Sequence, residues 1–366
     1  MTVRIATYNT ENLFRRPKVF ALPDDKQRRQ VLEDYAELVA LLDRDPYTEA
    51  DQLRMAELIK KYRLYDDNAE RPFVINETRG VHTLYRTGPP ADDPRIEFVA
   101  HGRSGWTGWV ELVRDDIDWT AVRNTARVIA EVDADVLLVQ EVEDRLTLQR
   151  FNKQVLGAAL GGRPYPYNMV IDGNDTRGID VGILSRHPIT SLRSHIFDQR
   201  PDGRPVFSRD CPEYEIAVDG TPLWLLGNHF KSQLHGGGAE LRLAQAERVV
   251  AIYEAARARS ARVLVAGDLN DSPGSAPVTT LRATGLRDAM SHPGYRGDPG
   301  THHTGRSDRD KLDYLFFPPE LWERIQHVGV ERRGIWAPRA FKSFETVTSK
   351  ATEASDHAAL YADLDL

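Results

Sequence analysis

Short polar motifs follow most of the apolar, strand-like runs of this 366-residue chain, and they constrain the fold more than any other feature. In order they are IATYNTEN (5–12), LLVQEVED (137–144), RGIDVGILSR (177–186), WLLGNHFKSQ (224–233), VLVAGDLNDSP (263–273), DKLDYLFF (310–317) and ASDHAAL (354–360). Because strand ends gather at one rim of a sheet, residues that are distant in sequence can meet there. We therefore expect one site that contains Asn9, Glu141, Asp180, Asn228, His229, Asp268, Asn270, Asp313, Asp356 and His357.

The expected site is rich in carboxylate and amide oxygens, has two histidines and contains no thiolate. Such ligands suit Mg²⁺ or Mn²⁺ rather than a structural zinc ion. A phosphodiester is anionic and resists attack by hydroxide, so its hydrolysis needs charge neutralisation and an activated water. The residue set therefore predicts a metal-assisted phosphoester hydrolase with Mg²⁺ or Mn²⁺ as its cofactor.

The order and spacing of the motifs resemble the endonuclease/exonuclease/phosphatase superfamily. Its members include pancreatic-type deoxyribonucleases, apurinic endonucleases, neutral sphingomyelinases and inositol-polyphosphate 5-phosphatases. The resemblance rests on YNTEN, QE, NHFKS, GDLN, LDY and SDH, and it covers residues 1–14 and about 117–366. It implies an α/β fold with mixed sheets, arranged as a four-layer α/β/β/α sandwich. Pattern alone predicts only a mixed α/β fold, because helices and strands do not alternate cleanly.

The resemblance also implies which residues hold the metal. Glu141, at the end of a buried strand, is the best single ligand, and Asp356 of the SDH motif helps to hold the ion. Asn9 either supplies an amide oxygen or orients Glu141. Some relatives carry a second polar ligand at the position of Glu11, and its role here stays open.

Four further residues are expected to perform the catalytic steps. Asp268 and Asn270 of GDLN would orient or deprotonate the attacking water and bind the phosphate. Asp313 of LDY would hydrogen-bond the ring of His357 and fix its tautomer. His357 would then act as a base or as an electrostatic clamp, and the choice of base between Asp268 and His357 stays open.

The NHFKS and RGIDVGILSR motifs add residues around the phosphate. His229 stands where deoxyribonuclease-like and sphingomyelinase-like members carry a phosphate-binding or acid histidine. Asn228 and Lys231 are expected to contact the substrate, although a solvated lysine is an equal alternative for Lys231. Asp180 is expected to orient the histidine or the substrate.

The domain organisation departs from simpler family members. We expect a single domain over residues 1–366 that carries an insertion at about 15–116, helical over 25–63 and with short strands over 72–113. The insertion is either a decoration on the sandwich edge or a cap that selects substrates. The arginines and tryptophans within 72–113 favour a cap, because arginine fits phosphate and aromatic rings stack on bases. The alternative is an ordinary surface with the tryptophans packed inward.

Composition restricts the partners. Lys plus Arg is 48 and Asp plus Glu is 55, so the net charge of −7 gives no basic footprint for tight, non-specific binding of nucleic acid. A local basic rim or a bound cation can offset this average. The single cysteine, Cys211, excludes an intrachain disulfide, and it is expected to fill space beside a strand. We see no signal peptide and no membrane span, and we expect a cytoplasmic protein.

These features rank three functions. A nuclease is the first, because YNTENLF and NHFKS look most like bacterial nuclease-type members. The alternative is a phosphatase or phospholipase-like enzyme that acts on a small phosphorylated molecule or a lipid head group. A catalytically silent scaffold is less favoured, because each core catalytic position is occupied by a competent residue. The Gly-rich segment HGGGAELR (235–242) is expected to be a mobile loop and is not assigned to the site. The pair His302–His303 is not assigned to it either, because adjacent histidines rarely chelate one ion.

Overall fold

The computed structural model describes residues 1–13, 15–22, 24–77, 82–91, 93–116, 118–175, 177–233 and 238–366. The chain divides into two compact units. The sandwich unit consists of Met1–Phe14 and Ile117–Leu366, and the insertion unit consists of Arg15–Asp116.

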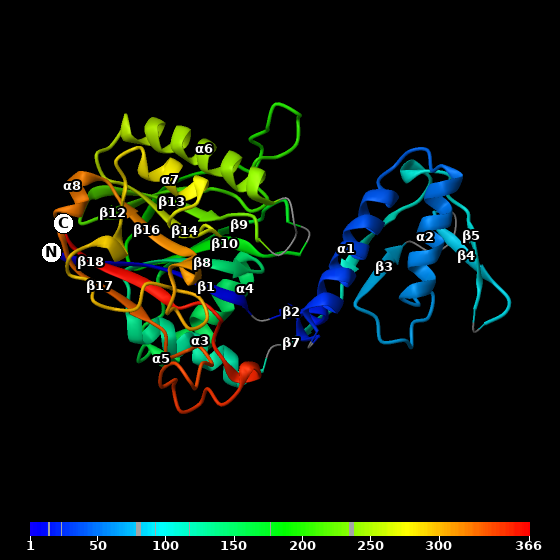
Figure 1. The fold of residues 1–366 in the computed structure, drawn as a ribbon, viewed down its shortest axis with the longest axis horizontal. Coiled ribbons are helices and arrows are strands. Elements are labelled where there is room, and N and C mark those ends of the chain that lie inside the picture. Colours follow the sequence, from blue (N-terminus) through cyan, green and yellow to red (C-terminus); the bar gives the residue numbers. More distant parts are fainter. Residues whose placement is uncertain are drawn as a thin grey trace. The chain divides into compact units, whose positions relative to one another are not determined.

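Two six-stranded mixed sheets form the centre of the sandwich unit (Figure 1). The strands of the first sheet, in spatial order, are β17 (Ile325–Glu331), β18 (Ala359–Asp365), β1 (Thr2–Leu13), β8 (Val136–Val142), β10 (Asp180–Ser185) and β9 (Tyr167–Ile171). Those of the second sheet are β11 (Ile189–Arg193), β12 (Glu213–Val218), β13 (Thr221–His229), β14 (Val263–Asp268), β16 (Asp313–Phe317) and β15 (Arg287–Asp288).

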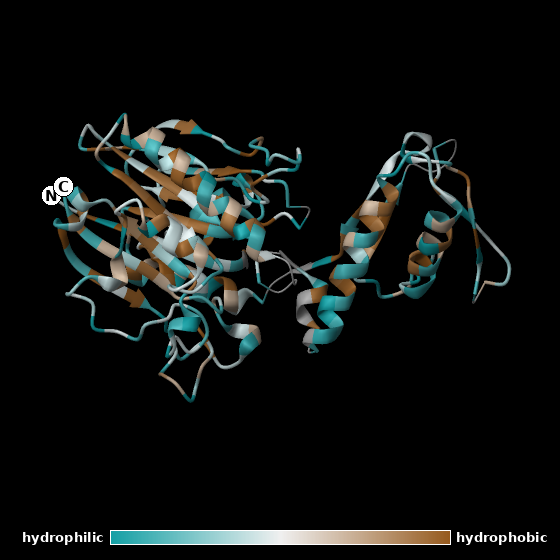
Figure 2. Cartoon of the chain, turned by 45° about the horizontal axis from the view of Figure 1, so that its top comes forward, coloured by the Kyte–Doolittle hydropathy of each residue, from teal (hydrophilic) through white to brown (hydrophobic). Residues whose placement is uncertain are grey.

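Alternating side chains of the strands fill different layers of the core. In β8, Val136 and Leu138 point between the two sheets, where they join a cluster that includes Leu225 and Leu264 of the second sheet. Leu137 and Val139 belong instead to the cluster on the outer face of the first sheet. This period of two is the one that a strand buried on both faces requires. The strands in the interior of the sandwich unit are accordingly mostly brown, or hydrophobic, in Figure 2.

Helices cover the outer face of each sheet, which completes the four layers (Figure 1). α3 (Trp119–Val132), α4 (Arg145–Phe151), a π-helical turn at Asn152–Leu156 and α5 (Gly157–Ala159) lie on the first sheet. α6 (Gly238–Arg257) and α7 (Ala276–Arg282) lie on the second, and α8 (Pro319–Trp322) packs into the central core. Short 3-10 turns complete the unit at Ala289–Ser291, Asp308–Asp310 and Lys350–Thr352. The α/β/β/α sandwich expected from the resemblance is thus confirmed.

The sequence pattern misplaced some element bounds. The apolar residues spaced along VFSRDCPEYEIAV (206–218) indicate one strand from the sequence, but only Glu213–Val218 is extended in the sheet. Polar Arg209 and Asp210 interrupt the earlier part, and both side chains are buried. The amphipathic pattern of RLAQAERVVAIYEAARARS (242–260) predicts a helix from residue 242, but α6 begins four residues earlier, at Gly238. Residues 235–237 of the Gly-rich segment lie outside the described residues.

Strand directions bring the polar motifs to one rim. β1 runs parallel to β8, and β13 runs parallel to β14, so four strands end at the same edge of their sheets. β10, β16 and β18 are antiparallel to these neighbours and begin at that edge. The register pairs Asp268 with His229 on one side and with Asp313 on the other.

The insertion unit has its own small core. α1 (Asp25–Leu42) and α2 (Glu49–Lys61) pack with β3 (Phe73–Glu77) and β6 (Gly108–Leu112), which form an antiparallel pair. β4 (Tyr85–Gly88) pairs with β5 (Arg95–Phe98), β2 (Arg15–Pro17) pairs with β7 (Arg114–Asp116), and 3-10 turns span Lys18–Ala21 and Arg103–Gly105.

The two tryptophans of the insertion unit differ in exposure. Trp106 is buried, its Nε1 donates to the hydroxyl of Tyr47 at 2.8 Å, and the guanidinium of Arg103 lies over its ring. Trp109 is 61% exposed. Trp106 is therefore a core residue, whereas Trp109 remains available to a ligand. Arg79, another residue of the expected cap surface, lies outside the described residues.

Gly267 allows β13 and β14 to approach each other. Its φ is 134°, and a Cβ at this position would lie 1.9 Å from the backbone oxygen of Asn228. We expect Gly267→Ala to lower the free energy of unfolding by more than about 4 kcal/mol, because the two strands would have to separate. Urea unfolding followed by circular dichroism measures this change.

Gly220→Ala is the matched control for this prediction. Gly220 also has a positive φ, 76°, but a Cβ there would meet no atom within 4 Å. Its substitution should cost about 1–2 kcal/mol, the penalty of the left-handed backbone alone. Equal losses at the two positions would show that contact with Asn228 does not limit Gly267.

Candidate functional site

Asp268, the last residue of β14, lies at the centre of the rim and is almost fully buried. Its Oδ1 accepts the backbone N–H of Asn270 at 2.8 Å, and its Oδ2 accepts the amide of the same residue at 3.2 Å. Two imidazole nitrogens face Oδ2: Nε2 of His229 at 3.6 Å and Nε2 of His357 at 3.9 Å. Burial raises the pKa of Asp268 above its ordinary range, although His357 opposes this effect.

Asn9 joins the two sheets at the rim. Its Nδ2 donates to Oδ2 of Asp268 at 3.0 Å and to Oε1 of Glu141 at 3.3 Å. Its Oδ1 accepts the backbone N–H of Glu11 at 3.0 Å. These bonds favour the orienting role over direct ligation, because the amide oxygen already has a donor. A metal contact by Asn9 stays a prediction.

His357 is held by a buried carboxylate. Its Nδ1 lies 2.8 Å from Oδ2 of Asp313, which also accepts the hydroxyl of Thr301 at 2.6 Å. Burial alone would lower the pKa of His357, but Asp313, Asp268 and Asp356 outweigh burial and raise it well above the usual value. The ring is therefore cationic near neutral pH, and its Nε2–H points towards Asp268.

His229 has the opposite environment. Arg209, whose side chain is 1% exposed, donates from Nη2 to His229 Nε2 at 2.8 Å and to the carbonyl of Phe230 at 3.0 Å. Burial and the charges of Arg209 and Arg177 lower the pKa of His229 well below its usual value. Glu141 and Asp268 lie 3.8 and 3.6 Å from the same nitrogen and favour protonation, but the closer arginine and the burial prevail. The ring is neutral, with its proton on Nδ1.

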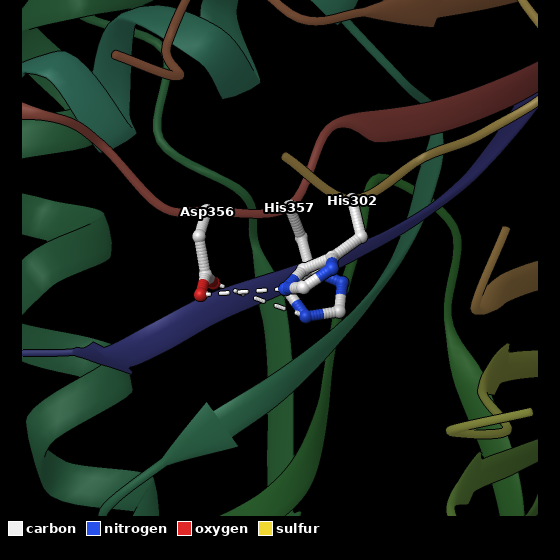
Figure 3. Close-up of side chains that lie close together, drawn as sticks. All are labelled: His302, Asp356 and His357. Carbon is white, nitrogen blue, oxygen red and sulfur yellow. Dashed lines mark ion pairs between the residues drawn. The ribbon is translucent and has the colours of Figure 1, made fainter. Parts of the chain in front are cut away.

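Glu141 and Asp356 are connected through the central residues. Glu141 contacts Asn9, and Asn9 contacts Asp268. On the other side, Nε2 of His357 lies 3.9 Å from both Asp268 and Asp356. Asp356 also lies beside His302, as Figure 3 shows, at 3.5 Å from its Nε2. The two predicted carboxylate ligands thus belong to one continuous cluster.

The remaining predicted residues lie at the rim but differ in their contacts. Asp180 accepts the backbone N–H of Gly173 at 2.8 Å, and burial raises its pKa to about 7. Asn228 donates to the carbonyl of Leu226 at 3.1 Å. The half-buried Lys231 has a lowered pKa because of burial and the charge of Arg177. In the part of the chain that the structure describes, the side chains of Asp180 and Asn228 form no hydrogen bond with His229 or His357.

Backbone strain gathers around these residues. Glu11, Glu141, Asn270 and His303 all have positive φ values, between 48° and 63°. This conformation is unfavourable for residues other than glycine, and it persists where surrounding structure holds it and where function uses it. The bond from the backbone N–H of Asp356 to Glu11, 3.1 Å long, shows how one such residue is held.

Three residues of the cluster escaped the sequence analysis. Arg209 precedes a strand within the run at 206–218, Thr301 lies in a loop ahead of LDY, and His302 was set aside with His303. Their side chains contact His229, Asp313 and Asp356, respectively, as described above. The sequence features that could have indicated them were a charged residue, Arg209, inside an apolar run and the adjacent histidines His302 and His303.

The donor set fits a divalent cation. Glu141, Asp268, Asp313 and Asp356 place four carboxylates in one largely buried cluster, and buried negative charge requires compensation. Oδ1 of Asp313 and Oδ1 of Asn228 are buried without a hydrogen-bond partner among the described residues. Carboxylate and amide oxygens are ligands that Mg²⁺ and Mn²⁺ accept.

Comparisons with solved structures agree with the fold. An endonuclease/exonuclease/phosphatase family protein from Bacteroides thetaiotaomicron is 16% identical, with a TM-score of 0.51 over 67% of this chain and 86% of that one. A mannosyl-6-phosphatase from the same organism is 18% identical, with a TM-score of 0.50 over 68% and 91%. A structure described as an endonuclease/exonuclease/phosphatase from Beutenbergia cavernae is 19% identical, with a TM-score of 0.48 over 67% of this chain. The present chain spans 66% of the length of that protein.

Two further findings concern curated relatives and membrane-spanning helices. No curated protein matches it. None of the helices within the described residues combines the length and the hydropathy needed to cross a membrane.

A sequence model of the endonuclease/exonuclease/phosphatase family matches residues 120–357. This match includes β8, β10, β13, β14 and β16 and ends at His357, so it covers most of the rim described above. Members of this family are hydrolases of phosphoesters. The chain belongs to the endonuclease/exonuclease/phosphatase family.

Proposed function

We propose that this protein hydrolyses phosphodiester bonds in nucleic acid with the help of a divalent metal ion, Mg²⁺ or Mn²⁺. The observation that carries the proposal is the position of Asp268 Oδ2 between the Nε2 atoms of His229 and His357. A carboxylate, a cationic imidazole and a neighbouring set of oxygen ligands are the groups that phosphodiester hydrolysis requires.

Glu141 and Asp356 would hold the metal ion, with Asn9 orienting Glu141. When bound, such an ion neutralises phosphate charge and makes water a stronger nucleophile. Oδ1 of Asp313 is buried without a hydrogen-bond partner among the described residues. This oxygen could accept a hydrogen bond from a water molecule or bind the metal ion.

Asp268 is the proposed general base. Asn9 donates to its Oδ2 and Asn270 donates to both of its oxygens, so the carboxylate is held in one orientation, in which Oδ2 would receive a proton from the attacking water. His357 is unsuited to this role, because the neighbouring carboxylates keep its ring protonated. Its Nε2–H instead donates to a phosphate oxygen and stabilises the charge that develops in the transition state.

Arg209 would bind the phosphate through its positive charge, and His229 would position the guanidinium. His229 accepts a hydrogen bond from Arg209 at Nε2, so this nitrogen is not a proton donor in the present geometry. The buried guanidinium supplies positive charge close to the catalytic carboxylate. Lys231 adds a further cation at the rim, which supports a polyanionic substrate despite the acidic average charge of the chain.

Glu141→Gln should reduce turnover by orders of magnitude and weaken metal dependence, because a neutral amide binds a cation less strongly than a carboxylate. Initial rates on plasmid, single-stranded DNA and RNA, measured across Mg²⁺ and Mn²⁺ concentrations and with EDTA, test this expectation. Glu143→Gln, two residues further along the same segment, is the control and should retain activity. Full activity of Glu141→Gln at ordinary Mg²⁺ would remove Glu141 from the site.

The substrate class is tested on the same enzyme with an aryl phosphodiester and an aryl phosphomonoester. A nuclease should cleave nucleic acid and the aryl diester well above the monoester. Faster cleavage of the monoester, with nucleic acid left intact, would instead identify a phosphatase. Hydrolysis of a phospholipid head group without cleavage of nucleic acid would identify a phospholipase-like enzyme.

His229→Ala and His357→Ala should each lower kcat by about 10²-fold or more, while KM changes little, if both groups act on the transition state. The double variant should lose much less than the product of the two single losses, because residues that act as a unit are non-additive. Steady-state kinetics on the aryl diester measures all three variants. Strictly multiplicative losses would indicate that the two rings act at separate places.

Arg209→Gln should raise the pKa of His229, because the arginine charge disfavours protonation of the ring. Burial remains in the variant, so the pKa should stay below the ordinary value. Histidine NMR titration of the metal-free protein measures the shift, with Arg248→Gln as a control for a remote arginine. An unchanged pKa of His229 would show that burial alone keeps the ring neutral.

A further inference from the structure

We propose that His302 is a nitrogen ligand of the metal centre, and that it shifts the preference of this centre from Mg²⁺ towards divalent ions that accept imidazole, such as Co²⁺ or Zn²⁺. The proposal rests on the proposed function, which places a metal at Asp356. It adds a ligand that the motifs do not contain, because His302 lies in a loop outside all seven of them.

The ring nitrogens of His302 and His357 both face the carboxylate of Asp356. Nε2 of His302 lies 3.5 Å from Oδ2 of Asp356, and Nε2 of His357 lies 3.9 Å from Oδ1. One potential ligand atom from each of these residues lies within 4.8 Å of the others. Figure 3 shows both rings directed at the carboxylate from neighbouring segments.

The separation of His302 and Asp356 suits a shared ion. Zn²⁺ binds imidazole nitrogen and carboxylate oxygen at roughly 2.0–2.2 Å, so two such ligands at a tetrahedral angle lie roughly 3.3–3.6 Å apart. The observed 3.5 Å falls within this range. It is longer than the roughly 2.7–3.2 Å of an ordinary N–H···O hydrogen bond, so the two groups lie at an ion-pair distance rather than in a short hydrogen bond.

The backbone holds these side chains in place before any ion binds. His302 faces His357 across an antiparallel bridge, and the N–H of Ala358 donates to the carbonyl of Thr301 at 2.6 Å. The N–H of His303 donates to the carbonyl of Asp356 at 2.8 Å. Because ligands held on paired segments lose little freedom on binding, the arrangement is preorganised for a cation.

His302 also changes the chemistry of the donor set. Glu141 and Asp356 are oxygen ligands of the kind that Mg²⁺ accepts, whereas imidazole suits Co²⁺, Zn²⁺ and related ions. His303 is the neighbour in sequence, and its ring stacks on His302 with centroids 3.7 Å apart. It is not one of the converging ligands, which makes it a matched control.

Isothermal titration calorimetry with Co²⁺ and with Mg²⁺ tests the proposal on the full chain and on the His302→Asn and His303→Asn variants. His302→Asn should weaken Co²⁺ binding by roughly tenfold or more, the size of effect that loss of supporting groups around metal sites already produces. Mg²⁺ affinity should change much less, because Mg²⁺ uses the oxygen ligands. His303→Asn should bind both ions as the unchanged chain does.

The visible absorption of bound Co²⁺ gives a second readout, because loss of an imidazole ligand should change the spectrum of His302→Asn and not that of His303→Asn. Unchanged Co²⁺ affinity and spectrum in His302→Asn would overturn the proposal. Equal loss of both ions would also overturn it, since this result would show a structural role. If metal-dependent hydrolysis still required Glu141 in either case, the proposed function would stand while this inference failed.

Discussion

The hydrogen bond from Asn9 to Asp268 joins the two sheets at the rim, and the site depends on it. The two residues are 259 positions apart and lie on strands of different sheets, β1 and β14. Asn9 also donates to Glu141, so it links the carboxylate proposed to bind the metal with the carboxylate proposed as the base. The sandwich core sets this geometry, because the inward side chains of both sheets determine how the sheets stack. The large apolar core and the small polar site are therefore parts of one arrangement.

The two histidines that face Asp268 differ in their protonation state. His357 faces Asp313, Asp268 and Asp356 and is held protonated, whereas His229 faces Arg209 and is held neutral. Groups whose surroundings separate their pKa values in this way can divide the work of a reaction. Asp268 lies between them and is buried, so its charge is sensitive to both rings. This arrangement is why we assign the base to the carboxylate and the clamp to His357.

The sequence predicted the rim because polar residues that end strands are recognisable beside apolar runs, and strand direction then brings Asn9, Asp268 and Asp313 together. Arg209, Thr301 and His302 could not be predicted in the same way, because loops carry them and no periodic pattern specifies where a loop side chain points. Asp180 illustrates the reverse case: its motif places it at the rim, but its side chain binds the backbone of Gly173 rather than a histidine. The substrate-selecting role of the insertion stays a prediction, since Trp106 belongs to its core and Trp109 alone of the two is exposed.

The strained backbone at the rim links stability to function. Positive φ at Glu141 and Asn270 costs free energy, on the order of 1–3 kcal/mol per residue, yet it turns each chain sharply where its strand ends. A relaxed, extended backbone would carry these side chains along the sheet instead of towards Asp268. The bonds of Asn270 to Asp268, and of Asn9 to Glu141, therefore hold the strained turns as well as the catalytic groups. At His303, a backbone bond to Asp356 holds a similar turn and thereby fixes His302 opposite His357. Positive φ at three separate positions, Glu141, Asn270 and His303, thus accompanies the turns that bring polar side chains to one rim.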